Sequence, residues 1–329
     1  MRHVLVTGGC GFIGSAFLRR YVPAHPEVHF TNLDALTYAG DPANVESVAG
    51  CPNYSFVHGD VRDRTLVNQL VKQIDGLVHF AAESHVDRSI VDSSDFVTTN
   101  ICGTHVLLEA ARQRPGLKFV LVSTDEVYGS LSEDDAASTE DSPLRPGSPY
   151  SAAKASADLL ALSFVRTYGL DVRITRCANN YGPFQYPEKL IPVLVRKAVA
   201  GASLPIYGDG RNIRDWLYVD DHAAAVLAVL QRGQAGRIYN VGGDSARRNL
   251  EIARGVLTHL SLPESRLEYV RDRPGHDWRY CVDDQRLRRE LQWKPETPFE
   301  AGMRQTIDWY LEQGEWVERA LARGQAATP

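Results

Sequence analysis

Short apolar runs rich in β-branched residues alternate with longer amphipathic stretches through the first half of the chain. The runs cover residues 3–7, 29–34, 54–58, 76–82 and 118–124, and each has the length of a strand. The segments between them have the length of helices. This alternation predicts a parallel sheet with right-handed crossovers, and therefore an α/β fold with helices on both faces of the sheet.

The pattern changes after Tyr181, where proline and glycine become more frequent and charged loops such as residues 271–277 appear. We interpret this half as a smaller domain that covers a ligand. Residues 214–219 and 237–241 still have the pattern of buried strands, and we expect them to return to the main sheet. The polar tail from Arg323 onward is expected to fray.

Composition excludes several classes of protein. The 329 residues are 43% hydrophobic and 23% charged, an ordinary globular balance. The longest wholly apolar run, residues 223–230, is much shorter than the roughly 20 residues of a membrane helix, so we expect a cytoplasmic protein. Five scattered cysteines without a CxxC pair argue for reduced thiols and against a metal site. A net charge of −5 argues against nucleic-acid binding but leaves a small phosphorylated ligand open.

The string VTGGCGFIGS directly follows the first predicted strand and opens a helix. It satisfies GxGxxG through Gly9, Gly11 and Gly14, and GxxGxxG through Gly8, Gly11 and Gly14. Glycines here permit a tight turn, close approach of backbone N–H groups to a pyrophosphate, and close packing of helix on strand. The loop favours a dinucleotide cofactor in a Rossmann-type domain.

Two aspartates extend the cofactor hypothesis. Asp34 closes the second predicted strand, where a carboxylate would accept hydrogen bonds from the adenosine ribose. Because Ala35 follows and no arginine is adjacent, NAD is favoured over NADP. The alternative for Asp34 is an ordinary turn aspartate. Asp60, after the third strand, is a candidate adenine contact, and its alternative is a helix N-cap.

Tyr150 and Lys154 lie four residues apart at the start of a predicted helix, so both side chains share one face. A tyrosine becomes a usable base when cations stabilise its phenolate, and Lys154 together with an oxidised nicotinamide would supply them. The alternative is a pair on the helix surface.

A second cluster, residues 123–126 (STDE), stands where the fifth predicted strand ends. Ligands of open α/β sheets bind at this carboxyl edge. The adjacent carboxylates of Asp125 and Glu126 suggest acid–base chemistry, since different environments can hold one protonated and the other ionised. The alternative is a loop or helix-cap cluster.

Motifs along most of the chain resemble those of the dTDP-glucose 4,6-dehydratases, which are extended short-chain dehydrogenases/reductases. They run in the expected order: TGGCGFIGSAF, LTYAG, HFAAESHVDRSI, STDEVYG, SPYSAAKAS, NNYGPFQYPEKLIP, PIYGDGRNIRDWLYVDDH, YNVGG and DRPGHDWRY. Related 4-epimerases share the glycine loop and YxxxK but not the Asp-Glu pair. Two features depart from the family pattern: Cys10 stands where alanine is usual, and the loop 129–146 is short and acidic.

The resemblance implies a domain division and an assembly. An NAD-binding Rossmann domain would comprise residues 1–178 and 212–243, and a nucleotide-sugar-binding domain residues 179–211 and 244–329. It also implies a homodimer, with the helices after Ser94 and Tyr150 packed across the two-fold axis. Aliphatic and small residues suit such a bundle, although they could instead face their own sheet: Leu107, Leu108, Ala152, Ala153, Leu159 and Leu160.

The resemblance further implies a mechanism for dehydrating dTDP-glucose with NAD. Tyr150 would take the proton of the 4-hydroxyl as hydride leaves C4, with Lys154 lowering the tyrosine pKa. Thr124 would hydrogen-bond the oxygen at C4. Glu126 would take the C5 proton, Asp125 would protonate the departing C6 oxygen, and hydride would return to C6. Oxidation at C4 is needed because a ketone acidifies C5 and places the C6 hydroxyl in the β position for elimination.

Two sets of binding residues follow from the glycine loop and the resemblance. The cofactor set is Gly8, Gly11, Phe12, Ile13, Gly14, Asp34, Leu36, Thr37, Asp60, Val61, Phe80, Ala81, Ala82, Ser84, Thr99, Tyr150, Lys154 and Asn180. The substrate set is Ser84, Thr124, Asn179, Lys189, Leu190, Pro205, Ile206, Tyr207, Arg214, Asn249, Asp272, Arg273 and His276.

Other interpretations stay open at this point. A 4-epimerase or decarboxylase acting on nucleotide sugars is one alternative, and a non-catalytic NAD-binding regulator is another. His79, His85 and Cys177 are interpreted first as packing residues, with a supporting role near the nicotinamide open for His85.

Overall fold

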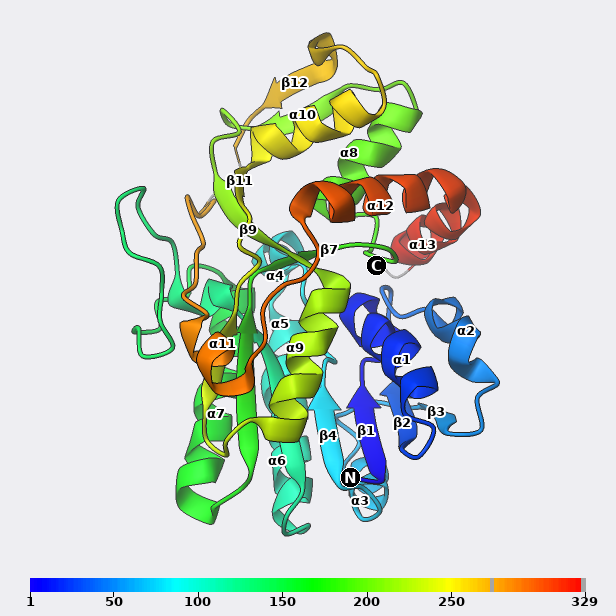
Figure 1. The fold of residues 1–329 in the computed structure, drawn as a ribbon, viewed down its shortest axis with the longest axis vertical. Coiled ribbons are helices and arrows are strands. Elements are labelled where there is room, and N and C mark those ends of the chain that lie inside the picture. Colours follow the sequence, from blue (N-terminus) through cyan, green and yellow to red (C-terminus); the bar gives the residue numbers. More distant parts are fainter. Residues whose placement is uncertain (273–274, 327–329) are drawn as a thin grey trace.

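The computed structural model describes residues 1–272 and 275–326. Seven parallel strands of this described part form the main sheet (Figure 1). In spatial order they are β10 (Ile238–Val241), β6 (Val172–Cys177), β5 (Lys118–Thr124), β4 (Gly76–His79), β1 (His3–Thr7), β2 (His29–Asp34) and β3 (Tyr54–His58).

Helices cover both faces of this sheet, and each face has its own apolar core. One face packs against α1 (Phe12–Ala24), α9 (Val219–Arg232) and α11 (Gln285–Leu291). The other packs against α3 (Arg64–Val71), α6 (Thr104–Arg112) and α7 (Pro149–Tyr168). Strands buried on both faces have continuous apolar sequences, which is why runs such as KFVLVST show no alternation. The predicted α/β fold of Rossmann type is confirmed.

Short segments connect the main elements and shape the carboxyl edge of the sheet. They are η1 (Pro42–Val45), α2 (Glu46–Ala49), α4 (Val86–Val91), α5 (Ser94–Phe96), the π-helical turn η2 (Val97–Gly103) and the 3₁₀ turn η3 (Asp125–Tyr128). Because η3 directly follows β5, it holds Asp125 and Glu126 at that edge.

A second group of elements lies beyond the carboxyl edge, at the top of Figure 1. Its strands are β7 (Asn179–Tyr181), β8 (Leu204–Tyr207), β9 (Ile213–Tyr218), β11 (Ala246–Arg248) and β12 (Leu267–Val270). Its helices are α8 (Leu190–Val199), α10 (Asn249–His259), η4 (Glu264–Arg266), α12 (Phe299–Glu312) and α13 (Gly314–Ala326). A separate, aromatic-rich core holds them together.

The predicted strands agree with the structure in most places and differ in two. The run 76–82 ends as a strand at His79, and its last residues instead lie along the cavity described below. Residues 238–241 do return to the main sheet beside β6, as expected. The prediction that 214–219 returns there was wrong, since β9 pairs with β7 and β11 in a separate sheet. Trp216 and Tyr218 of β9 pack against Tyr181 in the aromatic core, and these contacts favour pairing of β9 with β7 over pairing with the main sheet.

The polar tail is not frayed at Arg323, contrary to expectation. Helix α13 continues to Ala326, and Arg323 forms an ion pair of 2.7 Å with Asp41. On the same helix, Trp316 Nε1 donates to Asn44 Oδ1 at 2.8 Å. Figure 1 shows α13 directly above α1 and α2, so the C-terminal helix contacts the N-terminal half of the chain.

Among the described residues, no helix is both long enough and apolar enough to cross a bilayer.

Candidate active site

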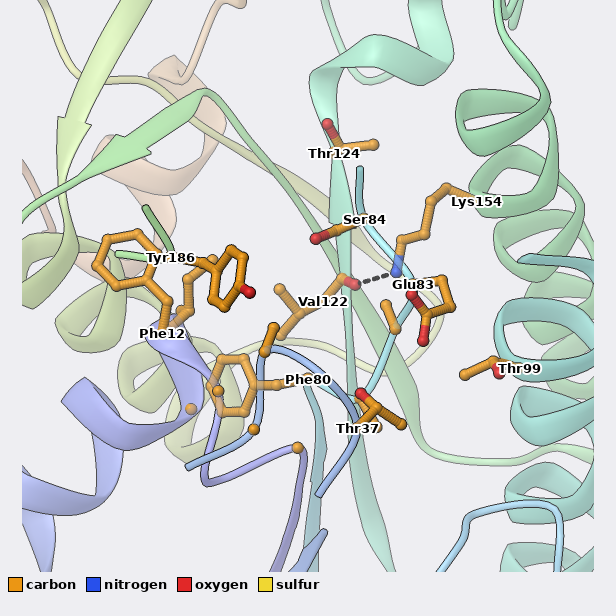
Figure 2. A pocket seen from close by; sticks show the side chains of 18 of the residues that line it. Phe12, Thr37, Phe80, Glu83, Ser84, Thr99, Val122, Thr124, Lys154 and Tyr186 are labelled. Carbon is orange, nitrogen blue, oxygen red and sulfur yellow. Dashed lines mark hydrogen bonds between the residues drawn. The ribbon is translucent and has the colours of Figure 1, made fainter. Parts of the chain in front are cut away.

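A cavity of about 370 Å³ lies at the carboxyl edge of the main sheet. Its walls come from the ends of β1, β2, β4, β5 and β6, the start of α7, and the segment that leads into α8. Ligands of doubly wound sheets bind at this edge. Figure 2 shows Phe12 and Tyr186 on one side of the cavity and Lys154 and Thr99 on the other.

The glycine loop forms a tight turn at one end of the cavity. Gly8 has a positive φ of 72°, and its backbone N–H donates to the Leu33 carbonyl at 2.9 Å. A Cβ on Gly14 would lie 2.3 Å from the Gly8 carbonyl oxygen, so α1 approaches the loop too closely for any side chain. Helix α1 begins without a side-chain cap, which leaves backbone N–H groups directed at the cavity. This geometry suits a pyrophosphate.

Asp34 is buried at the same end and organises the loop around it. Its carboxylate accepts from the backbone N–H groups of Cys10 and Leu36, both at 2.8 Å. Burial raises the pKa of Asp34, and these two hydrogen bonds oppose the rise. The bond to Leu36, two residues on, is the turn interaction named as the alternative, and Asp34 nevertheless also lines the cavity.

Asp60 also lines the cavity, where Arg62 lies 2.6 Å from its carboxylate. The N-cap of α3 is Asp63, whose side chain accepts from the backbone of Thr65 and Leu66. The alternative that Asp60 caps this helix was therefore wrong, because the cap lies three residues later.

Tyr150 and Lys154 lie in the first turns of α7, which begins with a capping box formed by Ser148 and Ser151. Tyr150 is 8% exposed and Lys154 is 5% exposed, so the alternative of a surface pair was wrong. Lys154 Nζ donates to the Val122 carbonyl at 2.7 Å (Figure 2).

The electrostatic environment of Tyr150 differs from the one expected. Burial, and then the charge of Glu126, raise the pKa of Tyr150 well above 10, while a hydrogen bond with Thr124 lowers it. These influences together favour the protonated phenol over the phenolate.

Thr124, Asp125 and Glu126 form the start of turn η3. Thr124 Oγ1 accepts from the Glu126 backbone N–H and donates to Asp125 Oδ1, both at 3.3 Å, so Thr124 does act as a cap. Asp125 is 3% exposed, and its Oδ2 has no hydrogen-bond partner among the described residues. Burial and the charges of Glu126 and Asp215 raise the pKa of Asp125 well above its usual value, against the effect of Arg214. A buried carboxyl group with a raised pKa thus stands beside a second carboxylate.

The structure brings almost all of the expected cofactor set together. Every member lines the cavity except Leu36, which has a left-handed backbone with φ of 53°. Sequence reasoning missed several lining residues: Tyr38, Ala39, Gly40, Arg62, Glu83, Asp95, Val122, Ala178, Gln185, Tyr186 and Glu188. Tyr38 could have been found, since it lies in the quoted motif LTYAG. Glu188 could have been found in the same way, since it lies in the quoted motif NNYGPFQYPEKLIP.

Comparison with known proteins gives the family. A family model described as GDP-mannose 4,6 dehydratase matches residues 5–306. A curated dTDP-glucose 4,6-dehydratase from Streptomyces griseus is 50% identical over 98% of both chains. The enzyme named dTDP-glucose 4,6-dehydratase 1 of Escherichia coli K12 is 44% identical over 96% of this chain and 94% of its own. The chain belongs to the dTDP-glucose 4,6-dehydratase family.

Solved structures of the family have the same fold. A double mutant of the dTDP-glucose 4,6-dehydratase from Streptomyces venezuelae, with NAD bound, has a TM-score of 0.94 at 48% identity and covers 97% of this chain and 100% of its own. A UDP-glucose 4-epimerase from Thermotoga maritima has a TM-score of 0.87 at 26% identity, over 94% of this chain and 99% of its own. The likeness to the dehydratases is therefore closer than the likeness to this epimerase.

The substrate residues implied by the dTDP-glucose 4,6-dehydratase family divide into two groups. Ser84, Thr124, Asn179 and Lys189 line the cavity, and Lys189 Nζ donates to the Ser84 carbonyl at 3.0 Å. The others lie in the second group of elements outside this cavity: Leu190, Pro205, Ile206, Tyr207, Arg214, Asn249, Asp272 and His276. Arg273 is outside the described residues.

Within the outer group, Arg214 is buried over the Tyr280 ring at 4.5 Å and donates to the Asp277 carbonyl at 2.9 Å. Asn249 begins α10, and its buried Oδ1 has no hydrogen-bond partner among the described residues. His276 Nδ1 and Asp272 Oδ1 lie 2.7 Å apart. The Ile206 side chain is fully buried in the aromatic-rich core, so only its backbone is available to a ligand. The ligand contacts of these residues stay predictions.

The three residues interpreted as packing lie close to the site. His79 is buried between the hydroxyls of Thr7 and Thr104, and burial lowers its pKa to about 3. His85 caps α4, and its Nε2 lies 3.6 Å from Glu188. Cys177 is buried and also lines the cavity.

Proposed function

We propose that this chain converts dTDP-glucose to dTDP-4-keto-6-deoxyglucose with a bound NAD. The observation that carries the proposal is the position of Asp125: a buried carboxyl group beside Glu126, with one oxygen that has no partner among the described residues, in the cavity that holds Tyr150 and Lys154. An epimerase needs no acid for a leaving group at C6. The relatives at 44–50% identity are named for this dehydration.

The cavity suits NAD. The glycine loop leaves backbone N–H groups uncovered where a side chain would not fit, and Asp34 lies at the same end, followed in the sequence by Ala35 and not by an arginine. The residues of the cofactor set that line the cavity would hold NAD, and Leu36 does not line the cavity. Structures of dTDP-glucose 4,6-dehydratases from Streptomyces venezuelae and Bacillus anthracis contain NAD. When bound, NAD stores hydride between its removal from C4 and its return to C6.

The side chains account for the proton transfers. Tyr150 takes the 4-hydroxyl proton when a cation beside it offsets the burial that holds its pKa high. Glu126 takes the C5 proton as the C6–O bond breaks. Asp125 gives its proton to the departing oxygen, so the product of this step is water. Thr124 donates its one hydroxyl proton to Asp125 here, and it would turn that proton to the oxygen at C4 when the sugar is bound.

Isotopic labelling tests the proposal. Purified protein incubated with dTDP-glucose and no added NAD should form a 4-keto sugar, because the cofactor is regenerated and stays bound. Substrate deuterated at C4 should give product with deuterium at C6 and a solvent proton at C5. Appearance of the label in solvent, or in free NADH, would exclude the redox-neutral cycle.

Two further features belong to this proposal. We infer that the protein is a homodimer. We also infer a cytoplasmic location, which is supported by its five free cysteines.

A further inference from the structure

A buried ion pair lies one helical turn from Lys154. Asp158, one turn further along α7, is fully buried, and its Oδ2 accepts from Arg176 Nε at 2.8 Å. Arg176 belongs to β6 and is 2% exposed. Taking two charges out of water is costly, and a hydrophobic pair of the same volume is often no less stable. Stability alone therefore does not explain these residues.

The pair continues into hydrogen bonds with the turn that carries the two carboxylates. Arg176 donates to the Tyr128 hydroxyl at 2.9 Å, and its guanidinium carbon lies 4.9 Å from the centre of that ring. Tyr128 donates in turn to Asn240 Oδ1 at 2.7 Å. Tyr128 is the last residue of η3, the turn that begins with Asp125. The ion pair thus connects the helix that carries Tyr150 and Lys154 with the turn that carries Asp125 and Glu126.

Lys154 shares its face of α7 with Tyr150, which lies four residues earlier. Three further titratable groups in the described part of the chain also act on it: Asp158 on α7, Cys177 on β6 and His79 on β4. Burial raises the pKa of Cys177 to about 12 and lowers that of His79 to about 3, so both are neutral near pH 7. Burial raises the pKa of Asp158, while the Arg176 guanidinium at 2.8 Å and Lys154 oppose that rise and favour the carboxylate. The i, i+4 spacing places Asp158 on the same helix face as Lys154.

We propose that Asp158 is a positioning residue for the dehydration proposed above: its buried carboxylate is the counter-charge of the Lys154 ammonium, and the Arg176–Tyr128 chain fixes it relative to Asp125 and Glu126. Burial lowers the pKa of Lys154 and Asp158 opposes that effect. Without this charge, Lys154 would lose its proton at a lower pH and would no longer stabilise a Tyr150 phenolate.

The protonation of Lys154 can be measured directly, since the chain has only six lysines. Holoenzyme labelled with ¹³C at the lysine Cε carbons is titrated by NMR, and Lys154→Met assigns the signal. Asp158→Asn should lower the Lys154 pKa by about 1 to 3 units, the usual effect of one close opposite charge. The alkaline limb of the kcat profile should move down by the same amount, with KM for dTDP-glucose little changed.

A matched control lies on the same strand. Arg173 of β6 has a buried guanidinium 2.8 Å from Asp171, at the end of the strand far from Lys154. Asp171→Asn weakens that ion pair and should leave the Lys154 titration and the kcat profile as in the wild type. Asp158→Glu, which keeps the charge, should restore both.

Two outcomes would overturn the proposal. One is an unchanged Lys154 pKa in Asp158→Asn. The other concerns the case in which Asp158→Asn does not fold. The double variant Asp158→Asn, Arg176→Met, which removes both buried charges, then takes its place, and a wild-type Lys154 pKa in that variant would overturn the proposal. The NMR titration needs no turnover, so a wild-type protein that forms no 4-keto sugar would contradict the proposed function and leave this result standing.

Discussion

Asp125 and Glu126 are neighbours in the sequence but have different surroundings. Asp125 is buried, with one oxygen bonded to Thr124 and the other without a partner in the described chain. Glu126 is half-buried, and its charge adds to the burial that raises the pKa of Asp125. Two adjacent carboxylates can therefore serve as acid and base because their environments separate their pKa values.

The acid assignment can be tested through the leaving group. Asp125→Asn should slow elimination from dTDP-glucose by about 10²- to 10⁴-fold, the usual contribution of an acid–base group. With fluorine in place of the C6 hydroxyl, much of this deficit should disappear, because fluoride leaves as an anion. Glu126→Gln should show no such rescue, since its proton at C5 is unchanged. The measurement is the ratio of variant to wild-type elimination rates on both sugars. An Asp125→Asn deficit of equal size on both would mean that Asp125 only holds the site in shape.

At the scale of elements, the approach of α1 to the glycine loop sets the end of the cavity. A Cβ at position 14 would collide with the backbone of Gly8, which cannot move aside as a flexible side chain can. Gly50 at the end of α2 has open space around it and a φ of −89°. These two glycines therefore provide a matched pair.

We expect Gly14→Ala to cost about 1–3 kcal/mol of folding stability, as overpacking does, and to displace the uncovered N–H groups of α1. The purified variant should consequently retain less NAD than the wild type. Gly50→Ala should match the wild type in both properties. Thermal melting and the NAD content of denatured protein give the two readouts. A Gly14→Ala variant with normal melting and normal NAD content would show that this contact is unimportant.

The elements also show what the sequence could and could not predict. Strands such as β5 were found because burial on both faces leaves an unbroken apolar run, here residues 119–122. The sheet to which β9 belongs was not predictable, since IRDWLY fits either sheet and its aromatic partner Tyr181 decides. Motifs located the cavity-lining residues well. The high pKa of Asp125 was beyond prediction because it depends on burial and on Asp215, which lies in a distant segment.

At the scale of the whole molecule, the structure narrows the surface available for a homodimer. Leu107 and Leu108 are fully buried against their own sheet, as the alternative interpretation allowed, so they cannot contact a second chain. On helix α7, Leu159 is 58% exposed. Val91 at the end of α4 is 89% exposed, and Val97 at the start of η2 is 44% exposed. These apolar side chains favour packing of α4, η2 and α7 across a two-fold axis.

Light scattering at micromolar concentration should therefore give twice the 36.5 kDa mass of one chain. Leu159→Glu should shift the mass toward the monomer, because the interface would then bury unpaired charges. Leu311→Glu is a suitable control, since Leu311 is 45% exposed on the distant helix α12. A wild-type protein of single-chain mass would contradict the homodimer.

Helix α13 has a consequence for the order in which the molecule is completed during synthesis. The Tyr186 hydroxyl, beside the cavity, donates to the carbonyl of Ala320 at 2.8 Å, and Asn44 accepts from Trp316. A ribosome makes the glycine loop and most of the sheet long before it reaches these residues, and domains fold as they emerge. A nascent chain can thus form the sheet but lacks these contacts until α13 has left the exit tunnel.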